Sequence, residues 1–91
     1  MSERALGIVG VGLIGGSIGM AARRAGWEVS GVDADATLER ALELGAIDHR
    51  ARLDDVRGAE MVVLAAPVSR IPGLLAELAP TEALITDVGC A

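Results

Sequence analysis

The chain has 91 residues, 52% of them hydrophobic, and a net charge of −5, so it has room for one small domain with one core. All eight basic residues are Arg and they form no basic patch, which argues against a nucleic-acid partner. The absence of Lys excludes Schiff-base chemistry and a P-loop, and the single Cys excludes an internal disulfide and a cysteine-cluster metal site, so a cytoplasmic protein without metal is expected.

Residues 5–22 are uncharged and resemble a short membrane span, but six of them are Gly. Each Gly costs roughly 1 kcal/mol in a helix interior relative to Ala, so a spanning helix of this composition would be poor. We interpret the segment as a strand, a turn and the start of a helix, and we expect no membrane partner.

Hydrophobic periodicity and Gly or Pro punctuation divide the chain into alternating strands and helices. Strands are predicted at 5–10, 28–33, 46–49, 61–66 and 83–88, with helices at 13–25, from Asp35 to just before Gly45, and at 71–78. The stretch 50–59 is predicted to be irregular.

Several local features refine these elements. The first helix is expected to bury a face made of Ile14, Ile18, Ala21 and Ala22, with Gly26 in a left-handed cap after it. Asp35 is predicted to be the N-cap of the second helix, whose apolar face is Leu38, Ala41 and Leu42.

The alternation predicts an α/β fold with a doubly wound parallel sheet. Right-handed crossovers place the first strand centrally and give the strand order 3-2-1-4-5. We expect residues 1–91 to form one dinucleotide-binding domain, truncated before a sixth strand, with the fifth strand as an exposed edge.

The most informative motif is Gly10-Val11-Gly12-Leu13-Ile14-Gly15, which ends an apolar strand and opens a helix. Gly10 permits the tight turn, Gly12 lets a pyrophosphate approach the backbone, and Gly15 allows close packing of the helix. The amides near Leu13 and Ile14 then face the phosphates at the positive end of the helix dipole. The alternative is a glycine-rich turn that binds nothing.

An acidic residue, Asp33, closes the second strand 18 residues after Gly15. A carboxylate there accepts hydrogen bonds from both ribose hydroxyls and repels a 2′-phosphate, so the sequence favours NAD over NADP. At the end of the fourth strand, Ala65, Ala66, Pro67 and Val68 are small or strand-ending residues that leave room beside a cofactor.

Three motifs in order make the chain similar to the amino-terminal domain of the prephenate/arogenate dehydrogenase family: 10–17, 65–68 and Thr86-Asp87-Val88-Gly89-Cys90. The resemblance spans nearly all of the chain. It implies a Rossmann domain followed by a helical dimerisation domain, and NAD-dependent oxidative decarboxylation of prephenate to 4-hydroxyphenylpyruvate in tyrosine biosynthesis, by a homodimer. It implies these cofactor residues: Gly10, Gly12, Leu13, Ile14, Gly15, Asp33, Ala66, Pro67 and Val68.

The chain departs from the family in two respects. Cys90 stands where family members commonly have a Ser that approaches the substrate, and a thiol is a weaker hydrogen-bonding group. The family's catalytic His and the basic residues that hold the substrate lie beyond Ala91. No catalytic residue is therefore expected here, apart from a possible substrate contact by Cys90, and the chain alone is expected to be inactive.

The one histidine, His49, is expected to face solvent rather than to act as a base, and Asp54 and Asp55 are read as a solvated pair. Trp27 is expected to pack between the first helix and the second strand. Two rival functions stay open: an arogenate-specific or other small-molecule dehydrogenase, and a nucleotide-sensing module without chemistry.

Overall fold

A computed structural model describes residues 4–88. The elements, in chain order, are β1 (Ala5–Val9), α1 (Leu13–Arg24), β2 (Glu28–Val32), α2 (Asp35–Glu43), β3 (His49–Arg50), the 3₁₀ turn η1 (Leu53–Gly58), β4 (Met61–Leu64), the 3₁₀ turn η2 (Val68–Arg70), α3 (Ile71–Leu78) and β5 (Leu84–Asp87).

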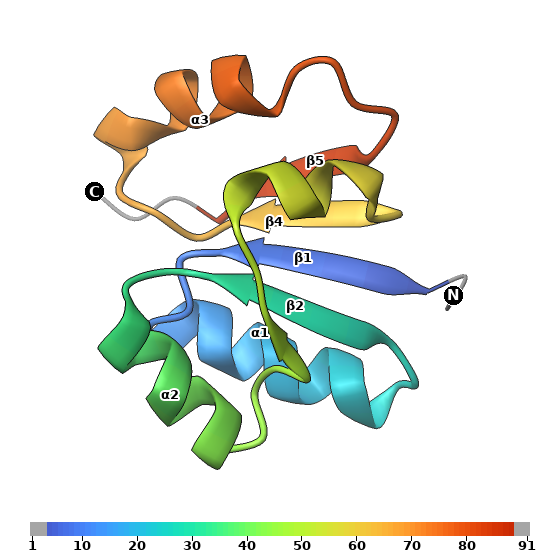
Figure 1. Ribbon diagram of the computed structural model, residues 1–91, viewed down its shortest axis with the longest axis vertical. Coiled ribbons are helices and arrows are strands. Elements are labelled where there is room, and N and C mark those ends of the chain that lie inside the picture. Colours follow the sequence, from blue (N-terminus) through green and yellow to red (C-terminus); the bar gives the residue numbers. More distant parts are fainter. Residues whose placement is uncertain (1–3, 89–91) are drawn as a thin grey trace.

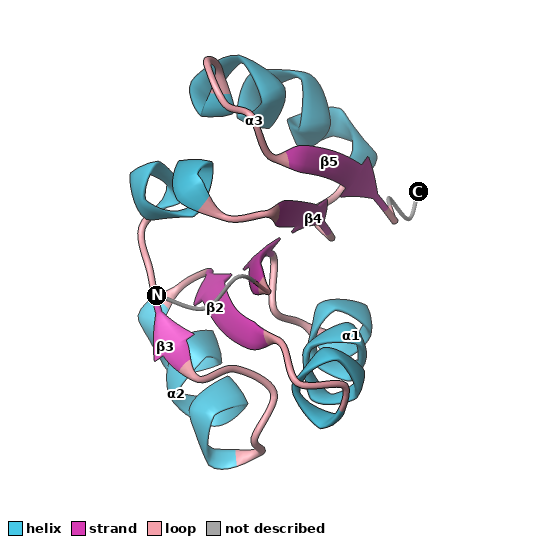
Figure 2. Cartoon of the chain, turned by 90° about the vertical axis from the view of Figure 1, so that its right-hand side faces the viewer, coloured by secondary structure: helices cyan, strands magenta, loops and turns pink. Residues whose placement is uncertain are grey.

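The strands form one parallel sheet in the order β3-β2-β1-β4-β5, which confirms the predicted topology. Helices α1 and α2 cover one face, and α3 and η1 cover the other (Figures 1 and 2). In the described part of the sheet β5 lies at one edge, where Leu84 is 63% exposed.

The core has two parts because successive strand residues point to opposite faces of the sheet. Ile8 and Val63 pack with the residues of α1 and α2, whereas Val9 and Val62 pack with Leu74 and the other residues of α3 and η1. Trp27 is half-buried against the first of these clusters, as expected.

The predicted buried face of α1 is partly wrong. Ile14 and Ala21 are exposed, and the buried positions of the helix are Gly15 and Gly19. A Cβ on Gly19 would lie 2.1 Å from the carbonyl oxygen of Ala46. The helix is turned so that its glycines, rather than its larger side chains, meet the backbone beneath it.

The start of α2 also differs from the prediction. Its N-cap is Ala34, and Asp35 is the first helical residue, with no side-chain cap. The Asp35 carboxylate instead lies 3.3 Å from the Arg50 guanidinium on β3. Leu42, which we expected on the apolar face, is 38% exposed.

Residues 50–59, predicted to be irregular, contain η1 and contribute to the core. Val56 is only 2% exposed and occupies the space above Gly7, where an added Cβ would lie 2.7 Å from it. Asp55, read as solvated, accepts a hydrogen bond from the Arg52 amide at 2.9 Å. Arg57 donates to the carbonyls of Glu77 and Leu78, which fastens η1 to α3.

The third strand begins later than predicted, at His49, because its ladder with β2 pairs only His49 and Arg50, while the Ala46 amide donates back to the Ala41 carbonyl of α2. The Asp48 carboxylate accepts hydrogen bonds at 2.8 Å from the Val29 amide and from the Arg23 guanidinium. Burial raises the pKa of Asp48, but these two hydrogen bonds and the Arg23 charge outweigh it, so the pKa lies below 3.8.

Candidate functional site

The glycine turn joins β1 to α1 at the carboxyl edge of the sheet. Gly10 has a φ of +95°, and a Cβ there would lie 2.8 Å from the carbonyl oxygen of Ala65, so any larger residue would be both strained and crowded. A Cβ on Gly15 would lie 2.0 Å from the carbonyl oxygen of Gly10. The start of α1 therefore rests directly on the turn, which is the close packing that the motif predicted.

The first turn of α1 presents backbone amides without a side-chain cap. Gly12 is the N-cap, and no side chain caps the helix there. A Cβ on Gly12 would meet nothing within 4 Å, so the space in front of it is open. Leu13 is 90% exposed and Ile14 is 44% exposed, and the first turn contains no acidic residue. The arrangement suits an anion at the positive end of the helix.

Asp33 directly follows β2 and connects two turns. Its Oδ2 accepts a hydrogen bond from the Val11 amide at 2.7 Å, and its Oδ1 accepts one from the Ala34 amide at 2.7 Å. The residue is exposed, and each carboxylate oxygen has a second lone pair available to a ligand. Asp33 thus holds the glycine turn in position and remains able to accept hydrogen bonds from hydroxyl groups.

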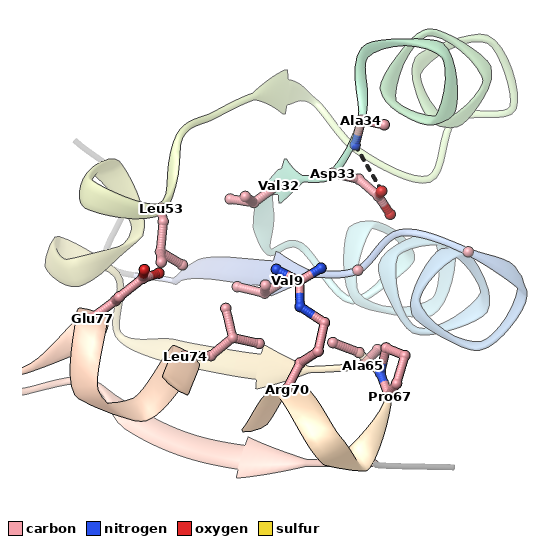
Figure 3. Close-up of a pocket in the computed structure, with 13 residues that line it drawn as sticks. Val9, Val32, Asp33, Ala34, Leu53, Ala65, Pro67, Arg70, Leu74 and Glu77 are labelled. Atoms are coloured by element: carbon pink, nitrogen blue, oxygen red, sulfur yellow. Dashed lines mark hydrogen bonds between the residues drawn. The ribbon is translucent and has the colours of Figure 1, made fainter. Parts of the chain in front are cut away.

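A cleft of ≈ 600 Å³ lies in front of Asp33, along the ends of β1, β2 and β4 and against α3 (Figure 3). Large aliphatic side chains, among them Val32, Leu53 and Leu74, line part of it. The residues that line the whole cleft are Val9, Gly10, Gly12, Val32, Asp33, Ala34, Leu53, Ala65, Ala66, Pro67, Arg70, Leu74 and Glu77.

A second hollow of ≈ 300 Å³ adjoins the first. Gly12, Ala65, Ala66 and Pro67 line both hollows, and the second extends past Leu13, Ile14 and Gly15 to Val88, just after β5. The shared wall places one hollow on each side of the glycine turn. Such a pair suits an elongated ligand whose middle lies over the turn.

The structure brings eight of the nine predicted cofactor residues to these hollows. Val68 is the exception: it is 50% exposed on η2 and lines neither hollow. Cys90 lies outside the described residues. His49 is exposed at the far edge on β3, where its Nε2 lies 3.4 Å from a Glu28 carboxylate oxygen.

Sequence reasoning missed the part of the cleft that comes from η1 and α3. Arg70, Leu74 and Glu77 line it together because their spacing of four and three residues places them on one helical face. That spacing, directly after the fourth strand, was a signal that could have found them. Leu53 gave no such signal, because the segment around it looked irregular.

A third hollow of ≈ 510 Å³ lies between α1 and α2, lined by apolar residues such as Met20 and Leu44 together with Arg40 and Thr37. It does not include Asp33 or the end of β4. Within residues 4–88, no group of three or more His, Cys, Asp or Glu side chains is placed to hold a metal, and no helix is long and apolar enough to cross a membrane.

Comparisons with known proteins identify relatives of the chain. A family profile described as "Prephenate dehydrogenase, nucleotide-binding domain" matches residues 18–91, a stretch that includes Asp33 and residues 65–68. Prephenate dehydrogenase of Bacillus subtilis (strain 168) is 42% identical over an alignment of 91 positions. The alignment covers 90% of this chain and 24% of that relative. The chain therefore spans about a quarter of the length of the curated relative it matches.

Two solved structures are also similar. Synechocystis arogenate dehydrogenase superposes with a TM-score of 0.85 at 33% identity, covering 93% of this chain and 32% of that one. M. tuberculosis FadB2 superposes with a TM-score of 0.72 at 24% identity, covering 92% of this chain and 40% of that one, and this likeness shows the fold alone.

Proposed function

This chain belongs to the family of prephenate dehydrogenase nucleotide-binding domains, and from that premise we propose that it binds NAD for the oxidative decarboxylation of prephenate to 4-hydroxyphenylpyruvate. In that reaction a hydride leaves the ring carbon that bears the hydroxyl, carbon dioxide departs, and the ring becomes aromatic. When bound, the nicotinamide supplies the hydride acceptor. The product is on the way to tyrosine, and the proposed compartment is the cytoplasm.

One observation carries the cofactor proposal: the open space at Gly12 and the uncapped amides of α1 lie beside an exposed carboxylate, Asp33. Gly10, Gly12 and the amides of Leu13 and Ile14 would hold the pyrophosphate. Each Asp33 carboxylate oxygen accepts one hydrogen bond from the protein, from the Val11 or the Ala34 amide. The remaining lone pairs would accept hydrogen bonds from the ribose hydroxyls.

The same carboxylate supports the choice of NAD over NADP. A 2′-phosphate on the adenosine ribose would lie directly against the Asp33 carboxylate. Two negative groups in contact repel each other. Among the described residues that line the cleft there is one cation, Arg70, which lies at the end of η2, across the cleft from the end of β2. We therefore propose that NADP binds more weakly than NAD.

The second hollow is the proposed position of the nicotinamide. Ala65, Ala66 and Pro67 would line one side of the ring, and Leu13, Ile14 and Val88 would exclude water from the other. Val68 and Cys90 are proposed as further contacts, to the cofactor and to the substrate respectively. The homodimer implied by the family is part of the same proposal.

Arogenate is the second candidate substrate, because the solved arogenate dehydrogenase superposes on nearly the whole chain. The two substrates differ away from the hydride-donating carbon, so one cofactor site serves either reaction. The described residues favour neither substrate.

Titration calorimetry with NAD and NADP tests the cofactor proposal. We expect both to bind in the cleft, with a dissociation constant for NAD at least tenfold lower than that for NADP. Tighter binding of NADP would contradict the role given to Asp33. Binding of neither dinucleotide by the folded chain would contradict the proposed function itself.

A further inference from the structure

Arg70 is the one cation among the described residues that line the main cleft. It is the last residue of η2, and its backbone amide donates to the Pro67 carbonyl at 2.9 Å, which fixes the turn that presents it. Its side chain runs from the start of α3 across the cleft toward Val9 at the end of β1 (Figure 3). The guanidinium therefore points toward the strand end from which the glycine turn begins.

The Arg70 guanidinium has no hydrogen-bond or ion-pair partner among residues 4–88. By contrast, the Arg23, Arg50 and Arg57 side chains each contact a carboxylate. The five N–H groups of Arg70 are thus available to a ligand in the cleft.

The charge balance of the cleft gives this arginine a role. Its walls carry two carboxylates, Asp33 and Glu77, while the glycine turn contributes only neutral amides. A ligand with a diphosphate brings two further negative charges. Arg70 is the group in these walls that offsets them, and a guanidinium matches phosphate geometry in a bidentate contact.

The order of residues along η2 and α3 indicates which phosphate Arg70 meets. Glu77 lies beside Leu53 at the far end of the cleft, Leu74 lies between, and Arg70 lies near Pro67 and the glycine turn (Figure 3). The aliphatic side chains of Leu53 and Leu74 suit the adenine. With the adenine there, Arg70 lies between the adenosine and the glycine turn. We infer that Arg70 binds the phosphate attached to the adenosine of the dinucleotide, an inference that rests on the proposed function.

The test compares the chain with its Arg70→Ala and Arg70→Lys variants, using NAD, ADP, AMP and adenosine as probes. Arg24→Ala, which removes the same charge from the far end of α1, is the matched control. Binding is followed by calorimetry for NAD and by NMR titration for the weaker ligands, and circular dichroism checks that each variant is folded.

We expect Arg70→Ala to weaken binding of NAD, ADP and AMP about tenfold, as for one charge-assisted contact, and to leave adenosine binding unchanged. Arg70→Lys should recover part of the loss because it restores the charge without the bidentate fork. Arg24→Ala should bind every probe as the unmodified chain does.

Three results would overturn the inference. An equal loss for adenosine and AMP would show that the guanidinium stacks on the base or only shapes the cleft. Unchanged NAD affinity in Arg70→Ala would show that it makes no contact, while leaving the proposed function standing. Failure of the unmodified chain to bind NAD would remove the proposed function, and the role of Arg70 with it.

Discussion

Replacing Gly15 by Ala is expected to separate α1 from the glycine turn. The added Cβ would lie 2.0 Å from the carbonyl oxygen of Gly10 and 3.2 Å from Cγ2 of Ile8, where ordinary contact begins at 3.4 Å. A backbone oxygen cannot rotate away as a flexible side chain can. The helix or the turn must therefore shift by about 1 Å to relieve the contact, and overpacking of this kind costs about 1–3 kcal/mol.

The neighbouring Gly16 is a matched control. A Cβ there would meet only the Ala46 Cβ, at 4.0 Å, so Gly16→Ala adds a methyl group to the same helix without crowding. Because Ala is favoured over Gly in a helix interior, this variant should be stabilised by about 1 kcal/mol. The same preference offsets about 1 kcal/mol of the strain in Gly15→Ala. If the strain is about 3 kcal/mol, the upper end of the usual range for overpacking, the free energy of unfolding falls by about 2 kcal/mol.

Urea denaturation measures both effects through the fluorescence of Trp27, the single tryptophan, which is half-buried against the core. With a slope of about 1 kcal/mol per M for a small domain, the Gly15→Ala midpoint should fall by about 2 M and the Gly16→Ala midpoint should rise by about 1 M. Gly15→Ala should also bind NAD more weakly. Equal midpoints for the two variants would refute the close packing of α1 on the turn.

Three further predictions concern other parts of the structure. Asp33→Ala should weaken NAD binding about 10- to 100-fold in calorimetry, because the ribose loses its acceptor and the Val11 amide its partner, and should weaken NADP binding less; equal losses would argue against a selective role. Asp48→Asn should cost about 1–2 kcal/mol of unfolding free energy near neutral pH. Since the folded-state pKa of Asp48 is lowered, this difference should shrink as the pH falls below 3.8, and a difference that grew in acid would contradict the assignment. Val56→Ala should lower the unfolding free energy by about 2 kcal/mol if η1 belongs to the core, whereas a surface turn would lose almost nothing in the same denaturation assay.

The topology was predictable because it depends on features that a sequence displays directly. Alternating apolar runs define the strands and helices, and the handedness of crossovers leaves few ways to order five parallel strands. The left-handed glycines Gly10, Gly26 and Gly45 end strands or helices where the sequence placed them. The structure confirms each of these positions.

The errors arose where specific contacts within a turn outweigh the helical pattern. Asp35 has the composition of an N-cap, yet the turn after Asp33 places Ala34 at that position. Ile14 has the periodicity of a buried residue, yet the near contact between Gly15 and Gly10 turns Ile14 outward. Neither contact is visible in a helical pattern.

Part of the candidate site was equally hidden from the sequence. Residue type and spacing are enough to predict the glycine turn and Asp33 from the sequence. By contrast, the packing of α3 and η1 on the sheet brings Arg70 and Leu53 to the cleft. Arginine and leucine occur on most surfaces and in most cores, so their residue types carry little information on their own. Only the fold brings them opposite Asp33.

The most direct test of the central claim is an NMR titration of the ¹⁵N-labelled chain with NAD. It shows which backbone amides change chemical shift when NAD binds. The structure predicts the largest chemical-shift changes in the glycine turn from Gly10 to Gly15, at Ala34 and at Ala66. All of these residues except Val11 line the two hollows at the carboxyl edge of the sheet. Changes centred instead on Met20, Arg40 and Leu44, in the groove between α1 and α2, would contradict the site proposed here.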